Sequence, residues 1–62
     1  MYFAISLPAD SDSQFHHAAR ETIVGAMKDA KSRPSHDAQI VQVSGLRRVV
    51  ARREAGQSWS QI

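Results

Sequence analysis

The chain has 62 residues, no cysteine, 42% hydrophobic and 23% charged residues, and a formal net charge of +2 at pH 7. These figures fit one small domain over residues 1–62 and exclude a second domain, a disulfide framework and a cysteine-based metal site. Nine of the 26 hydrophobic residues are alanines. Few side chains can therefore fill a core, and we expect marginal stability supported by a partner or by oligomerisation.

Charge and hydropathy also bound the setting in which the chain works. No apolar run approaches the roughly 18 to 20 residues of a membrane span, and the apolar opening stretch lacks the basic flank of a signal peptide. We therefore expect a cytoplasmic protein with no membrane partner. Residues 1–30 carry a net charge of −2 and residues 31–62 a net charge of +4, so the basic C-terminal half is the first candidate for a binding region.

The first expected element is a strand over residues 2–7, where apolar side chains alternate until Pro8 ends the run. Ser11 and Gln14 then have the spacing of a capping box, which predicts a helix over about residues 12–32. The apolar stripe expected on this helix consists of Phe15, Ala19, Ile23, Ala26, Met27 and Ala30.

The C-terminal half predicts strands. Residues 38–43 are rich in β-branched side chains and are followed by a turn signal. Residues 47–53 allow two interpretations, a helix or the second strand of a hairpin. We favour the strand, because a helix there would set Arg53 within its apolar side and would be too short to hold without packing. A turn at residues 54–57 and a short strand at 58–62 would follow.

These elements predict an α+β fold in which one amphipathic helix packs on a small antiparallel sheet in the order β-α-β-β, with the last short strand as a fourth. One face of the first strand and one side of the helix should point into the core. The expected core residues are Phe3, Ile5, Leu7, Phe15, Ile23, Met27, Ile40, Val41, Val43 and Trp59.

Motifs for catalysis and cofactor binding are missing from the sequence. No Gly-x-Ser-x-Gly elbow accompanies the serines, and the three glycines stand far apart, unlike a phosphate-binding loop. His16 and His17 are neighbours, so on a helix they would point about 100° apart and could not share one metal ion. We expect no enzyme, no metal and no cofactor, and leave His16 as a candidate for a pH-sensitive contact.

Paired arginines carry the main functional hypothesis. In the strand interpretation, Arg48 and Arg52 lie on one face about 13 Å apart, at roughly 3.3 Å per residue. Guanidinium groups at that spacing could contact successive phosphates or two carboxylates of a partner. The structural alternative is that the charges protect an exposed strand from edge-to-edge aggregation. The candidate partner-binding or nucleic-acid-binding residues are Arg47, Arg48, Arg52, Arg53, Arg33 and Lys31.

Two resemblances give the hypothesis a concrete form. Residues 4–8, followed by a polar helix start, resemble the opening of ribbon-helix-helix DNA-binding proteins, which implies a dimeric transcriptional regulator or antitoxin. In size, order of segments and lack of catalytic motifs, the chain is similar to small phage-encoded inhibitor proteins, among them anti-CRISPR proteins. That resemblance implies a non-enzymatic inhibitor that occludes a nuclease complex through its arginine face. We prefer this second interpretation, with a protein or nucleoprotein complex as partner, and leave nucleic acid and a homodimer as alternatives.

Overall fold

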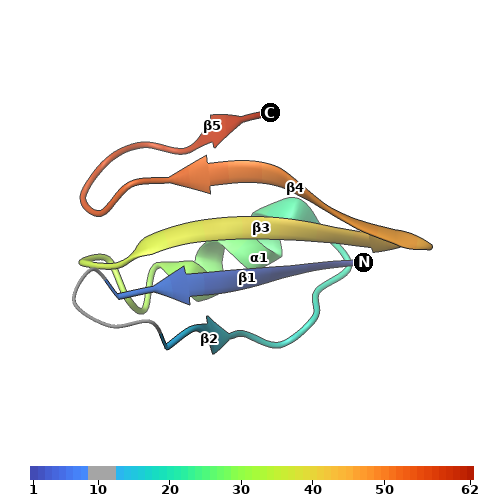
Figure 1. Ribbon diagram of the computed structural model, residues 1–62, viewed down its shortest axis with the longest axis horizontal. Helices are drawn as coiled ribbons and strands as arrows, with labels where there is room; N and C mark the ends of the chain where they lie inside the picture. Colours follow the sequence, from blue (N-terminus) through green and yellow to red (C-terminus); the bar gives the residue numbers. More distant parts are fainter. Residues whose placement is uncertain (9–12) are drawn as a thin grey trace.

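The computed structural model describes residues 1–8 and 13–62. Within these residues the strands form one antiparallel sheet in the order β2-β1-β3-β4-β5, and the helix packs on one face of it, behind β1 and β3 in Figure 1. The predicted α+β class, one helix on a small antiparallel sheet, is confirmed. The elements are β1 (Tyr2–Leu7), β2 (Phe15–His16), α1 (Ile23–Ala30), β3 (Asp37–Ser44), β4 (Leu46–Arg53) and β5 (Ser60–Gln61).

The predicted first strand is confirmed as β1, and it has neighbours on both edges. On one edge, β3 pairs with it along its whole length. On the other edge it pairs with β2, and the His17 N–H donates to the Ala4 carbonyl at 2.9 Å. Farther along, Arg20 and Tyr2 exchange two backbone hydrogen bonds of 2.6 and 2.7 Å. β1 is therefore an interior strand of the sheet.

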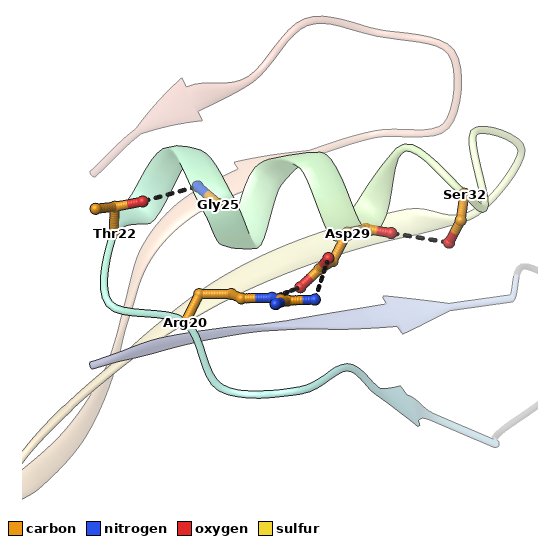
Figure 2. Close-up of polar contacts among 5 residues, drawn as sticks. All are labelled: Arg20, Thr22, Gly25, Asp29 and Ser32. Carbon is orange, nitrogen blue, oxygen red and sulfur yellow. Dashed lines mark hydrogen bonds and ion pairs between the residues drawn. The ribbon is translucent and has the colours of Figure 1, made fainter.

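The helix predicted over about residues 12–32 is wrong in its first half, where the chain forms β2 instead. An uncovered edge of β1 leaves a row of backbone groups unpaired, and the polar stretch before α1 satisfies them. The helix begins after Thr22, whose Oγ1 accepts a hydrogen bond from the Gly25 N–H at 3.0 Å (Figure 2). Ser11 of the expected capping box lies outside the described residues.

The predicted hairpin is confirmed as β3 and β4, and it contains a bulge that the sequence did not predict. Ile40 and Val41 of β3 pair with Ala51 and Val49 of β4, which leaves Val50 between them as an extra residue. An extra residue shifts the alternation of the strand, so residues before and after it exchange faces. This shift decides where the arginines of β4 point.

Two glycines turn the chain where we expected turns. Gly45 joins β3 to β4 with a φ of +87°, and Gly56 lies between β4 and β5 with a φ of +74°. Residues with a side chain rarely adopt positive φ angles, whereas glycine adopts them freely. A short strand does occur within the predicted residues 58–62, but it is limited to β5 (Ser60–Gln61), and Trp59, which precedes it, packs inward against the core as expected.

The core between α1 and the sheet is built mainly of small side chains. Alanines from α1 meet alanines from three strands, and Ile40 is the largest apolar side chain that is fully buried there. Small residues let the short helix approach the sheet closely, so the layer is thin. The buried cluster is Ala4, Ala26, Ala30, Ala38, Ile40 and Ala51, with Tyr2, Ile23, Met27, Val50 and Trp59 packed around it.

The predicted orientation of β1 is wrong. Ala4 is buried against α1, and successive residues of a strand face opposite sides. Phe3, Ile5 and Leu7 therefore lie on the face away from the helix. Hydrophobic alternation suggested the reverse, because it does not account for how closely a helix with Ala26 and Ala30 on its inner side approaches the sheet. Val43 also lies on the far face and Phe15 is exposed. Val41 lies on the far face too but is buried, as predicted, and Ile23, Met27, Ile40 and Trp59 pack in the α1 layer as predicted.

Candidate functional site

The four arginines of β4 do not share a face. Arg52 pairs with Gln39 and Arg48 with Gln42, and these two glutamines occupy opposite faces of β3. The expectation that Arg48 and Arg52 lie side by side on one face is therefore wrong, and the bulge at Val50 is the reason. By the same register, Arg47 and Arg52 share the face opposite α1, while Arg48 and Arg53 lie on the α1 side.

Arg53 is built into the fold. It is only 7% exposed. Its Nη2 donates to the carbonyls of Arg33 at 3.1 Å and His36 at 3.0 Å, and its Nη1 lies 3.5 Å from the Ala30 carbonyl. The guanidinium also lies 5.2 Å from the centre of the Trp59 ring. This arginine holds the end of α1 and the following loop against the sheet.

Arg33 and Lys31 lie beside Arg53, beyond the end of α1. The Arg33 guanidinium stacks 4.0 Å from the centre of the Phe15 ring, and its backbone carbonyl accepts from Arg53. Lys31 is the exposed C-cap residue of α1, where a cation suits the helix dipole. These residues lie near the Arg53 end of β4, at the opposite end of that strand from Arg47.

The sheet face away from α1, which we call the open face, is apolar at its centre. No helix or strand of the described chain lies over it, and it is the face turned toward the reader in Figure 1. The sequence did not reveal this surface, because its apolar residues look like core. A hollow of about 260 Å³ on it is lined by Phe3, Ile5, His16, Gln39, Val41, Arg47 and Val49, and Arg48 also borders it, although the register and its hydrogen bond to Gln42 place the Arg48 side chain on the α1 side.

Rings and charges border this apolar centre. Phe3 stacks on His16 with 5.9 Å between ring centres and 19° between planes, and the Arg47 guanidinium lies 5.9 Å from the Phe3 ring centre. Arg52 lies farther along the same face, next to a second hollow of about 500 Å³ at the turn before β5. Among the described residues, Arg47, Arg48 and Arg52 have no carboxylate within ion-pair distance.

A serine, a histidine and an aspartate meet on the other side of the sheet, which the sequence did not predict. The Ser6 Oγ lies 2.8 Å from the His17 Nε2. Burial lowers the pKa of His17 below its usual 6.5, the Asp29 charge opposes this shift, and the Arg33 charge adds to it. Hydrogen bonding to Arg20 at 2.7 and 3.1 Å lowers the pKa of the Asp29 carboxyl (Figure 2).

This cluster does not have the geometry of a catalytic triad. Ser6 is 0% exposed, so its hydroxyl cannot reach a substrate, and the Asp29 carboxylate is engaged by Arg20 on both oxygens. Across the described ranges, no three His, Asp or Glu side chains come together as metal ligands, and no helix is long and apolar enough to cross a membrane. The open face and the arginines at its edge remain the candidate site.

Comparison with known proteins gives no independent assignment. No protein family model matches the sequence, and neither a curated protein nor a solved structure matches it. The functional argument therefore rests on the chemistry of the open face.

Proposed function

We propose that this chain is a non-enzymatic binding protein that docks on a partner protein, or on the protein part of a nucleoprotein complex, through the open face of its sheet. The observation that carries the proposal is the apolar centre formed by Phe3, Ile5, Val41 and Val49, where Val41 is 6% exposed, the other three are half-buried, and no helix or strand of the described chain lies over them. The exposed arginines of the same face, Arg47 and Arg52, lie at its edge.

The composition of the open face favours a protein as the partner of its centre. Protein interfaces combine an apolar middle with aromatic and arginine side chains and a polar rim. Three of the four central side chains, Ile5, Val41 and Val49, are aliphatic. Nucleic-acid platforms instead stack bases on rows of aromatic rings, and Phe3 is the one phenylalanine that lines the hollow. An aliphatic surface gains more by burial against apolar side chains than by contact with phosphates.

The charges at the edge specify the partner further. Arg47 and Arg52 have no carboxylate of their own chain to neutralise them within the described residues. A partner surface with acidic groups around an apolar patch would complement the two arginines, and it would bind more tightly than a surface with basic groups around that patch. The inhibitor resemblance fits this picture, since a docked 62-residue domain can occlude a target-binding surface without any catalytic step.

The alternative function, a dimeric regulator of the ribbon-helix-helix kind, would need β1 to pair with its twin in a second copy. Both edges of β1 are already paired, with β2 and β3. The described residues also provide one helix, α1, where that architecture uses two. The arrangement favours docking through the open face.

The test is affinity capture from a lysate of the source organism, with tagged wild-type protein and two variants as bait. Ile5→Glu places a charge in the apolar centre, and Val24→Glu places the same charge on α1, where Val24 is 57% exposed. We expect one protein to be retained by the wild type and by Val24→Glu and lost with Ile5→Glu, provided that all three baits have the same circular dichroism spectrum.

Two outcomes would contradict the proposal. Equal capture by Ile5→Glu would place the contact elsewhere on the molecule. Sedimentation showing a dimer that Ile5→Glu dissociates would make a second copy of the chain the occupant of the open face. A charge-reversed variant, Arg47→Glu with Arg52→Glu, tests the edge separately and should weaken the same capture, whereas Lys31→Glu at the end of α1 should not.

A further inference from the structure

The β3–β4 hairpin projects beyond the rest of the sheet as a two-stranded arm. The last residue pair between β1 and β3 is Tyr2 opposite Gln42, and β5 pairs only with Ala51 and Arg52 of β4. The Val43 N–H still donates to the Met1 carbonyl at 2.9 Å, so residues 44–46 have no neighbouring chain on either side within the described residues, with Arg47 and Arg48 at their base, and the hairpin tapers to a tip at the right of Figure 1. We call residues 43–48 the arm.

The arm is cationic on both faces. Arg47 and Arg48 are exposed neighbours on one strand, so their side chains leave the arm on opposite faces. Arg47 pairs with Val43, and Arg48 pairs with Gln42 and donates to its Oε1 at 3.3 Å. Asp37 is the carboxylate of the hairpin and stands at the end of β3 away from the tip, and among the described residues no carboxylate forms an ion pair with Arg47 or Arg48.

The tip of the arm carries an apolar residue in full contact with solvent. Leu46 follows the turn glycine and is 87% exposed, the largest exposed fraction among the exposed large hydrophobic residues of the described chain. An exposed leucine at the end of a basic arm costs solvation free energy unless a partner covers it.

From this arrangement we propose that the arm binds duplex DNA by entering the major groove tip first, with Arg47 and Arg48 facing the phosphates on the two walls and Leu46, which lies at the tip on the Arg48 face, nearest the base edges. This proposal is separate from protein docking by the open face. Apolar side chains at the groove floor contact the thymine methyl group, so Leu46 has a partner there.

The dimensions select the groove. A sheet layer with its side chains is about 10 Å thick, from the spacing of packed sheets. The major groove of B-form DNA is about 12 Å wide and admits a two-stranded ribbon, whereas the minor groove is about 6 Å wide. The arm fits the first and not the second.

The two-sided charge separates this partner from other polyanions. A flat acidic protein surface, or a single nucleic-acid strand, can face only one side of the arm and would leave Arg47 or Arg48 unpaired. A groove presents phosphates on both sides. The major groove of duplex RNA is deep and narrow, and side chains cannot enter it, so the arm should discriminate DNA from RNA.

The experiment is fluorescence anisotropy with labelled duplex DNA, duplex RNA and single-stranded DNA of one sequence, at salt concentrations from about 50 to 200 mM. We expect duplex DNA to bind in the range of sequence-independent binding, with a Kd on the order of 10⁻⁵ M at the low-salt end. Duplex RNA and the single strand should bind with an affinity at least about tenfold lower than that of duplex DNA. Poly-glutamate added as an acidic competitor should not displace the DNA.

Variants locate the contact. Arg47→Gln and Arg48→Gln should each reduce the slope of log K against log salt by about 0.9, the value for one phosphate contact. Arg52→Gln is the matched control, because it removes the same charge from an exposed position of β4 outside the arm, and its slope should equal that of the wild type. Leu46→Ser should weaken binding without changing the slope, since it removes no charge.

Three results would overturn the proposal: no binding to duplex DNA at 50 mM salt, equal affinity for duplex RNA, or a loss of slope with Arg52→Gln equal to that with Arg47→Gln. The last would mean that net charge alone attracts the DNA. Ile5→Gln, which disturbs the apolar centre without placing a charge beside Arg47, should leave DNA binding unchanged and weaken protein capture, so the two proposals can fail independently.

Discussion

Two adjacent arginines on β4 show how neighbouring residues of one type take different roles. Arg52 is exposed on the open face, whereas Arg53 is buried and hydrogen-bonded to backbone carbonyls beyond α1. Composition treats the two as equal members of a basic cluster. Strand alternation separates them, and only the position of the helix decides which one becomes buried.

His17 predicts a dependence of stability on pH. Its pKa in the folded protein is lowered from 6.5, chiefly by burial, with Asp29 and Arg33 acting in opposite directions. The unfolded chain therefore binds a proton more readily than the folded one, and stability falls as the pH drops through 6.5 toward the lower folded value. Urea denaturation at pH 7.5 and 5.5 should show a lower midpoint at pH 5.5.

The substitution His17→Asn should remove much of that difference between the two pH values. The control is His16→Asn, which changes the neighbouring exposed ring, whose Nε2 lies 3.3 Å from Gln14, and should leave the difference in place. The fall should be shallow, because water screens a partly exposed ring. Equal pH dependence in His17→Asn and the wild type would show that other groups cause it.

At the scale of elements, local signals were sufficient for β1, β3, β4 and β5. Alternation of apolar residues, β-branched runs and the turn glycines identified these strands and favoured a strand over a helix for residues 46–53. β2 was missed because two residues carry no periodic signal, and they pair only because an edge of β1 is free. The residues that flank β2 in the sequence are equally compatible with the start of a helix, so the helix that we predicted was too long.

The sequence predicted only part of the candidate site, because it shows the residue types but not the faces of the sheet on which they lie. The exposed arginines Arg47, Arg48 and Arg52 could be identified by type, but the bulge at Val50 that divides them between faces depends on packing against β3 and the core. The apolar centre was misplaced because Phe3 and Ile5 have the pattern of core residues. Contacts between residues distant in sequence decide which face of a sheet a helix covers. The alternation of apolar and polar residues has the same period for either choice, so it does not identify the covered face.

The N-cap of α1 gives a prediction at this scale. The helix has eight residues, too few to be stable without its cap and its packing. Thr22→Ala removes the hydroxyl that accepts from the Gly25 N–H and should lower the free energy of unfolding by about 1 kcal/mol in urea denaturation. Thr22→Ser keeps the acceptor and should stay near the wild-type value. Similar losses in both variants would point to packing of the threonine methyl instead.

At the scale of the whole molecule, the fold has one thin core and one uncovered apolar face. The layer between α1 and the sheet holds mostly alanines, so burial of large side chains contributes less here than in a domain with a thick core. Several of the other large apolar residues, among them Phe3, Ile5 and Val49, are half-buried on the open face, where a partner would bury them further. Polar contacts that join distant elements should therefore account for an unusual share of the stability.

Arg53 makes several of these contacts at once, because it links β4 to the Arg33 and His36 carbonyls and lies over the ring of Trp59 before β5. Arg53→Met keeps an apolar stem but removes the donor to both carbonyls; the Arg33 carbonyl keeps the His36 N–H at 3.1 Å, whereas the partly buried His36 carbonyl loses this donor, which costs about 1–3 kcal/mol. A domain of this length has a total stability of roughly 3–9 kcal/mol, so a loss of about 3 kcal/mol would consume a third or more of it. Urea denaturation should show this loss.

The matched control stands one residue away. Arg52→Met removes the same charge from an exposed position and should change the free energy of unfolding by less than about 0.5 kcal/mol. Arg53→Lys keeps the charge but not the planar fork that reaches two carbonyls, so it should fall between the two methionine variants. If Arg53→Met and Arg52→Met were equally stable, the link between α1 and the sheet would rest on the alanine layer alone. The thin core would then be sufficient to hold the fold.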